Sequence, residues 1–188
     1  MHYALLMKAL RALLNPAVAC FLAFAAPVMA DDVKLDDLFA QLQTTDDKGA
    51  AAITSQIWTE WAKSGSPSMD LLLQRGEQAM QLGDLPSAIG HFTAIIDHAP
   101  EFAEAWNARA TAYYNAGQLG PSIADIQHVL ALNPRHFGAL AGLGMIFEQL
   151  GEPDKALEVY KAALAVNPHM PQVKDAVKRL SAAKGQDL

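Results

Sequence analysis

The sequence predicts an all-α protein, a solenoid of helix–turn–helix units. Two landmarks recur in steps of 34 residues, the glycines Gly83, Gly117 and Gly151 and the prolines Pro100, Pro134 and Pro168. Two independent landmarks that keep one period through three copies indicate a structural repeat. Setting each proline at position 32 gives three units, residues 69–102, 103–136 and 137–170. The length of 188 residues, with 52% hydrophobic residues, is typical of one folded domain.

Residues 1–30 are predicted to be a secretory signal peptide outside the fold. Lys8 and Arg11 lead an apolar stretch that ends in small residues at Ala30, which is the order of features that such signals share. We expect cleavage after Ala30 and a periplasmic or secreted mature protein without a stable membrane span. The alternatives are a retained membrane anchor, since the apolar stretch is near the lower length for a span, and a lipid anchor at the sole cysteine, Cys20.

Residues 31–68 are predicted to be a degenerate helical pair that forms an N-terminal cap. One step of 34 residues before the first unit places Leu38 at position four, Gly49 at position 15, and Trp58 and Trp61 at positions 24 and 27. This register favours core packing for both tryptophans, and a ligand-facing aromatic pair is the alternative.

The three units share residues of the same size at the same position. Positions eight and 20 are small in every unit: Gly76, Ala110 and Gly144, then Ala88, Ser122 and Ala156. Small residues at these two positions let the two antiparallel helices of one unit approach closely. Position 24 is bulky, with Phe92, Ile126 and Tyr160. The landmark glycines are predicted to end each first helix, because glycine takes the left-handed conformation of a helix C-terminus without steric cost.

This pattern resembles the tetratricopeptide repeat family over residues 69–170, and residues 31–68 resemble a degenerate unit of the same family. The resemblance implies a right-handed superhelical stack with a concave face that binds other proteins. Residues 171–188 are predicted to form a C-terminal capping helix and tail, because Val173, Val177 and Leu180 fall on one helical face and charges on the other.

An ion pair is predicted inside the second unit. Arg109 stands at position seven, and Asp125 stands at position 23 on the paired helix. The first unit has His91 in place of the aspartate. We expect the pair to be partly buried, so that loss of one partner costs more stability than the pair contributes.

No catalytic or cofactor-binding signature occurs in the sequence. It has no Gly-rich phosphate loop, no Gly-x-Ser-x-Gly elbow and no His-Glu-x-x-His pair. His91 and His98 lie two helical turns apart, too far to bind one metal ion directly. A balance of 14 Lys+Arg against 20 Asp+Glu argues against nucleic acid as a partner. We therefore predict a non-enzymatic protein with no cofactor and no metal.

The resemblance implies that the first helices line the concave face through positions two, five, nine, 12 and 13. The candidate partner-binding residues are Glu77, Met80, Asn107, Thr111, Tyr114, Met145 and Glu148. The whole face has four carboxylates and no Lys or Arg, which favours a basic or neutral partner over an acidic one. For each of these residues, a merely solvated position is the alternative.

Family members that bind the C-terminal carboxylate of chaperones place Lys at position five and Asn at position nine. In the three units these positions hold Leu73 and Glu77, Asn107 and Thr111, and Ala141 and Met145. That clamp is absent, so chaperone-tail binding is not expected from the resemblance.

The predicted function is that of an exported scaffold that binds a peptide or partner protein of the cell envelope in its concave groove. The alternative is a self-associating structural subunit, or an accessory component of a cell-envelope assembly.

Overall fold

The computed structural model describes residues 29–186, which form nine helices and no strand. This confirms the predicted all-α class. Residues 1–28 of the predicted signal peptide lie outside the described residues, and Met29 and Ala30 begin the helix α2 (Met29–Thr44). In the described part of the chain, none of the helices has both the length and the apolar character that crossing a bilayer requires.

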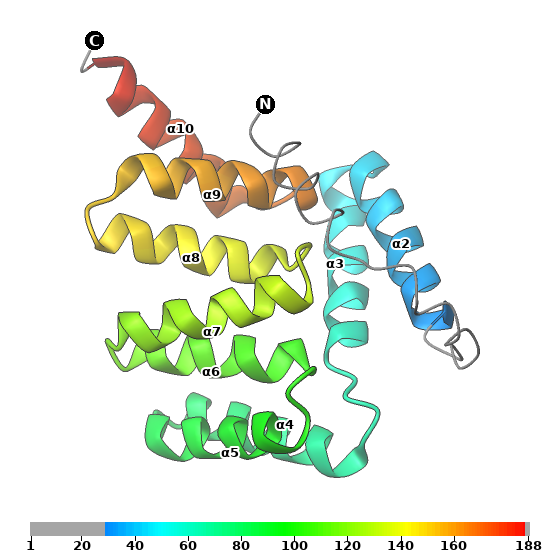
Figure 1. Ribbon diagram of the computed structural model, residues 1–188. Coiled ribbons are helices and arrows are strands. Elements are labelled where there is room, and N and C mark those ends of the chain that lie inside the picture. Colours follow the sequence, from blue (N-terminus) through cyan, green and yellow to red (C-terminus); the bar gives the residue numbers. More distant parts are fainter. Residues whose placement is uncertain (1–28, 187–188) are drawn as a thin grey trace, which may run out of the picture.

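Six helices form three pairs that stack side by side (Figure 1). The pairs are α4 (Pro67–Gln81) with α5 (Leu85–His98), α6 (Ala103–Asn115) with α7 (Leu119–Leu132), and α8 (Phe137–Gln149) with α9 (Pro153–Val166). The end helix, α10 (Pro171–Gln186), packs on α9 through a cluster that includes Val173 and Leu180. Each pair corresponds to one of the 34-residue units.

Glycines fix both the turn and the spacing within a unit. The glycines that follow the first helices, Gly83, Gly117 and Gly151, have φ angles of 76°, 72° and 73°, as predicted for helix C-termini. At position eight, a Cβ on Gly144 would collide with the ring of Tyr160. The two helices of the third unit are therefore closer together than any side chain at position eight would allow.

The predicted Arg109–Asp125 ion pair is confirmed, and it also reaches the first unit. The guanidinium donates from Nε to Oδ2 of Asp125 over 2.8 Å and from Nη2 to Oδ1 over 2.9 Å. Its Nη1 donates to Oγ1 of Thr93 in α5 over 3.0 Å. Through these hydrogen bonds the Arg109 side chain joins α6 to both α5 and α7.

The N-terminal pair, α2 and α3 (Asp47–Trp61), does not extend the stack as a further unit before α4. Figure 1 shows α3 running across the ends of the repeat helices. Leu71 of α4, at position three, is 47% exposed, whereas Ala105 and Ala139 at the same position of the next units are 0% and 1% exposed. The face of α4 that a preceding unit would cover is therefore open, and the expected cap of the first unit lies elsewhere.

The pair packs on the third unit. Its apolar side chains form one buried cluster with Phe137 of α8, and Trp58 lies against Gly138, where a Cβ would collide with the indole ring. Gln43 donates from Nε2 to the carbonyl oxygen of Val166 over 2.7 Å. The bare backbone at Gly138 and the open carbonyl at the end of α9 provide a docking surface, and the repeat register alone does not reveal it.

Polar contacts also join the pair to the loop before α10. Nδ1 of His169 lies 2.5 Å from Oδ1 of Asp47, and its Nε2 lies 3.1 Å from the carbonyl oxygen of Leu42. The hydrogen bond from His169 and the charge of Lys174 hold the pKa of Asp47 below its usual range.

Trp58 and Trp61 pack against a buried cluster, as predicted, but this cluster lies between the pair and α8 and not inside a further unit. The ring of Trp61 stacks on the buried His136 ring with centroids 4.3 Å apart. Trp58 meets the ring of Phe137 edge-on at 5.4 Å. These contacts make Trp61 a packing residue. Trp58 packs as well, but it is only half-buried and also lines a cavity of about 630 Å³ beside Asp47 and His169.

Candidate protein-binding groove

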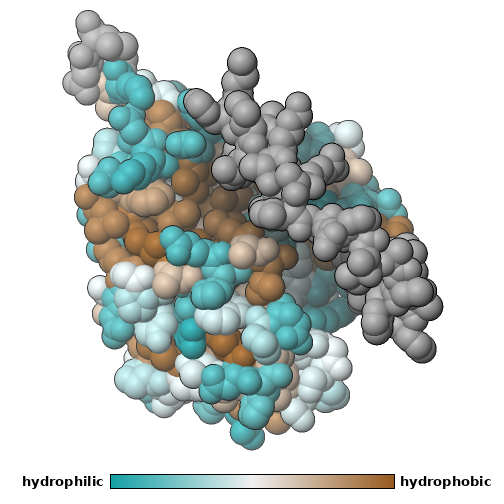
Figure 2. Space-filling view, viewed as in Figure 1, coloured by the Kyte–Doolittle hydropathy of each residue, from teal (hydrophilic) through white to brown (hydrophobic). Residues whose placement is uncertain are grey.

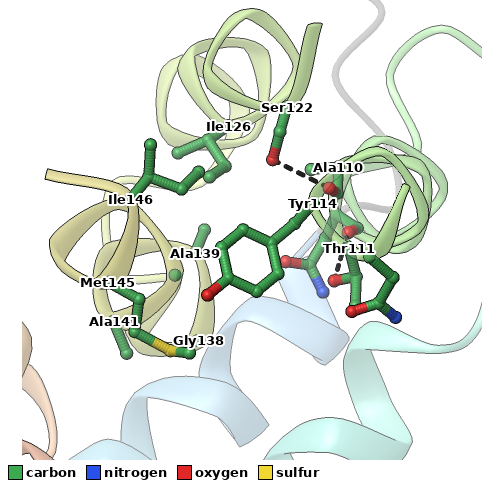
Figure 3. A pocket seen from close by; sticks show the side chains of 13 residues that line it. Ala110, Thr111, Tyr114, Ser122, Ile126, Gly138, Ala139, Ala141, Met145 and Ile146 are labelled. Atoms are coloured by element: carbon green, nitrogen blue, oxygen red, sulfur yellow. Dashed lines mark hydrogen bonds between the residues drawn. The ribbon is translucent and has the colours of Figure 1, made fainter. Parts of the chain in front are cut away.

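A cavity of about 290 Å³ opens between the first helices of the second and third units. Tyr114 of α6 and Met145 of α8 both extend into it (Figure 3). The first-helix residues at its rim stand at positions predicted for the concave face: Asn107, Thr111, Tyr114, Asn115, Gly138, Ala141 and Met145. Its floor is small or apolar: Ala110, Ser122, Ile126, Ala139, Gly142 and Ile146.

The hydroxyls of Ser122 on the floor and Thr111 on the rim already have hydrogen-bond partners within the fold. The Ser122 hydroxyl donates to the carbonyl oxygen of Ala110 over 2.8 Å, and Thr111 Oγ1 donates to the carbonyl oxygen of Asn107 over 3.0 Å. The Tyr114 hydroxyl, by contrast, has no hydrogen-bond partner among residues 29–186. A molecule in the cavity would therefore meet an apolar floor and one open hydroxyl at the rim.

An exposed apolar surface continues from the cavity along α8. Met145 is 48% exposed although it lies at the cavity rim. Figure 2 shows hydrophobic side chains gathered over α8, with hydrophilic residues around them. An unbranched thioether side chain adapts its shape to different contacts, and methionine is common at surfaces that bind several peptides.

Two carboxylates lie beside the cavity, on α4 and at the start of α6. Glu104 accepts a hydrogen bond from Asn107 Nδ2 over 2.9 Å, and Asn107 is itself a rim residue. Burial and the negative charge of Glu104 raise the pKa of Glu77 above its ordinary value. Both carboxylates stand at concave-face positions of neighbouring units, Glu77 at position nine and Glu104 at position two.

The buried imidazole of His136 fixes the position of Glu104 without neutralising its charge. Its Nδ1 accepts the backbone N–H of Ala139 over 3.0 Å, as the N-cap of α8. The hydrogen of a neutral ring therefore lies on Nε2, which is 3.1 Å from Oε2 of Glu104 and donates to it.

Glu148, a predicted partner-binding residue, makes internal contacts. It accepts the Tyr160 hydroxyl over 2.9 Å and Arg179 Nη2 of α10 over 2.6 Å. Burial and this hydrogen bond raise the pKa of Tyr160 well above its usual value. The first helices have no Lys or Arg on the concave face, but the end helix brings Arg179 to its edge, and positions within one repeat unit do not predict this contact.

The other predicted residues divide between the cavity and the neighbouring unit. Asn107, Thr111, Tyr114 and Met145 line the cavity, whereas Glu77 and Met80 lie on α4, outside its lining. Met80 packs against the core of the first unit. Within residues 29–186, no three His, Cys, Asp or Glu side chains gather in a way that could hold a metal ion.

Comparison with known proteins identifies the repeat. The model of the tetratricopeptide repeat family matches residues 73–125 and 109–171. The chain belongs to the tetratricopeptide repeat (TPR) family. A TPR repeat-containing protein of Rhizobium etli is 37% identical over 136 residues, which cover 72% of this chain and 67% of the relative. The Hsp70-Hsp90 organizing protein 1 of Glycine max is 26% identical over 106 residues, which cover 56% of this chain and 18% of that protein.

Solved structures share the TPR fold. The first TPR domain of Spaghetti (RPAP3), solved bound to the HSP90 peptide SRMEEVD, superposes with a TM-score of 0.59 at 21% identity and covers 62% of this chain and 93% of that one. MamA superposes with a TM-score of 0.59 at 21% identity, over 86% of this chain and 87% of that one. At these identities the likeness concerns the fold.

The TPR register located the rim of the cavity but not its floor. Rim residues such as Asn107 and Tyr114 follow from first-helix positions. Floor residues such as Ala110 and Ile126 stand at positions eight and 24, which the sequence analysis assigned to packing between helices. A signal was available, because Gly138, Ala141 and Gly142 lack the bulk to fill the space between neighbouring units.

Proposed function

We propose that this TPR protein is an exported, non-enzymatic scaffold that binds a peptide segment of a partner protein between α6 and α8. The observation that carries the proposal is the open apolar cavity at concave-face positions. Its rim has the exposed Met145 and the Tyr114 hydroxyl, which has no hydrogen-bond partner in the described part of the chain. Apolar concave sites with a few polar groups suit ligand binding. The RPAP3 domain, which shares the fold, was solved with a peptide bound.

The proposed partner is a basic or neutral protein of the cell envelope. Glu77 and Glu104 give the groove a negative edge, which opposes an acidic partner. The chaperone-tail clamp is absent at positions five and nine, so the proposal does not extend to chaperone C-termini. The composition of residues 1–30 supports export. N-terminal sequencing of the protein from fractionated cells tests it, with Asp31 as the expected first residue.

Affinity capture tests the groove. The protein is immobilised beside a Tyr114→Ala/Met145→Ala variant, which removes both side chains that extend into the cavity, and beside Gln127→Ala, an exposed position on α7 outside the lining. Mass spectrometry then identifies what each retains from an envelope extract. We expect one partner to be retained by the parent and by Gln127→Ala and lost from the double variant. Equal retention by all three contradicts the groove as the binding site.

Self-association is a second candidate function, favoured by the open face of α4. Leu71 is 47% exposed where its equivalents in the other units are buried, so a second copy could cover it. Light scattering across a concentration series tests this candidate, with Leu71→Lys as the disrupting variant. A monomer at every concentration excludes it.

A further inference from the structure

The groove has two chemically different parts that lie side by side. One is the apolar cavity between α6 and α8, which can enclose an apolar side chain. The other is the pair of carboxylates on α4 and α6, Glu77 and Glu104. Asn107 joins the two parts, since it lines the cavity and donates to Glu104 over 2.9 Å.

The fold itself does not neutralise the two carboxylates. Among residues 29–186 no Lys or Arg forms an ion pair with either of them, and the hydrogen-bond partners of Glu104 are the amide of Asn107 and the ring of His136. That ring is a helix N-cap through Nδ1 and donates from Nε2, so it adds a hydrogen bond and no positive charge. An added cation would relieve the repulsion between Glu77 and Glu104.

We propose that the groove selects extended peptides in which a Lys or Arg lies about three residues from an apolar side chain. The apolar side chain occupies the cavity between α6 and α8, and the cation binds between Glu77 and Glu104. This inference rests on the proposed function, because it specifies the ligand of the same groove.

The spacing follows from helix packing. The cation site lies between α4 and α6 and the cavity lies between α6 and α8, so one step between neighbouring helices separates them. Packed helices are about 8–10 Å apart, and an extended chain advances about 3.3 Å per residue. One helix step therefore corresponds to about three residues of ligand.

Phage display tests the inference. The protein is recovered from cells that express the full chain, and peptides that bind it are selected from a library of random dodecapeptides. The selected peptides are then measured against Glu77→Gln and Glu104→Gln, which keep the side-chain shape, and the amide oxygen of the second variant still accepts from His136. Glu158→Gln, an exposed carboxylate of α9, is the matched control. Tyr114→Ala/Met145→Ala tests the groove itself.

The inference expects selected peptides with a basic and an apolar residue at the stated spacing. Each Gln variant should bind them about tenfold more weakly, the control should bind them unchanged, and affinity should fall as salt screens the charges. The inference is overturned if the selected peptides lack a basic residue, or if they bind the Gln variants as tightly as the parent. If the double variant nevertheless fails to bind them, the proposed function still stands. No enrichment, or equal binding to the double variant, overturns both.

Discussion

Arg109 and Asp125 show what a single residue contributes to the contact between units. Their bidentate pair is largely shielded from solvent, since the side chains are 13% and 6% exposed. Removing one partner leaves the other charge buried and unpaired, which costs more than the net value of the pair.

We expect Arg109→Met to lower the free energy of unfolding by about 3–5 kcal/mol. The double variant Arg109→Met/Asp125→Leu should recover most of that loss, because an apolar pair replaces the charges. Urea unfolding followed by circular dichroism measures both. A single variant as stable as the parent would show that Asp125 is hydrated after the change.

The raised pKa of Glu77 predicts that the stability of the protein depends on pH. Its pKa is raised from the ordinary value of 4.5 by burial and by Glu104. The folded state therefore binds the proton of the Glu77 carboxyl more tightly than the unfolded chain does. The protonated carboxyl stabilises the fold at low pH, and this contribution is lost as the pH rises through the raised pKa. We expect Glu77→Gln to be slightly more stable than the parent at neutral pH, by less than about 0.5 kcal/mol, because Glu77 is only partly buried and solvent still screens its charge.

Below the ordinary pKa of a glutamate, the Glu77→Gln variant and the parent should unfold at the same temperature, because both side chains are then neutral. Thermal melts at neutral and strongly acidic pH measure the difference. A gap between the two proteins that persists in acid would assign the effect to packing rather than to charge.

At the scale of the helices, the distance between α8 and α9 depends on a glycine, Gly144, at their contact. A Cβ at Gly144 would collide with Tyr160, whereas a Cβ at Gly142, on the same helix, would meet Ile126 Cδ1 at 3.8 Å, an ordinary contact. We expect Gly144→Ala to cost about 1–3 kcal/mol through overpacking. Gly142→Ala should be neutral or stabilising by up to about 1 kcal/mol, because alanine favours the helix. Chemical denaturation of both variants makes the comparison, and equal effects would contradict the close approach.

The elements were predictable where the signal is local. Gly83 and its equivalents determine helix ends through their own backbone, and the size of Gly144 and Tyr160 determines a spacing within one unit. The docking of α2 and α3 was not predictable, because Trp58 has a suitable register for a further unit. In the structure Trp58 contacts the backbone of Gly138, which has no side chain in the way. The 34-residue period does not pair these two positions.

The same distinction applies to the candidate groove. Tyr114 and Met145 could be placed at its rim because first-helix positions recur with the repeat. The cavity floor depends on how two neighbouring units are spaced, and the internal contacts of Glu148 depend on Arg179 from the end helix. Neither property follows from a position within one unit.

For the whole molecule, the contact between the N-terminal pair and the third unit determines how the chain unfolds. Trp61 stacks on His136, and His136 caps α8. We expect Trp61→Ala to lower the unfolding free energy by about 3 kcal/mol and to speed proteolysis within α2 and α3. Gln56→Ala, an exposed change on α3, should alter neither. Limited proteolysis with mass spectrometry measures the cleavage sites, and unchanged protection of α3 in Trp61→Ala would contradict this role of the stack.

The return of the N-terminal pair to the third unit also bears on the order in which the chain can fold. Several of its bonds join residues 122–127 apart in sequence, whereas the units of a solenoid ordinarily need only their neighbours. During synthesis α2 and α3 leave the ribosome before any repeat exists, and their partner residues at the start of α8, at the end of α9 and in the loop after it are made much later. The helices that emerge first therefore reach their native contacts only after α9 and His169 have been made, and they wait until then with an apolar face uncovered.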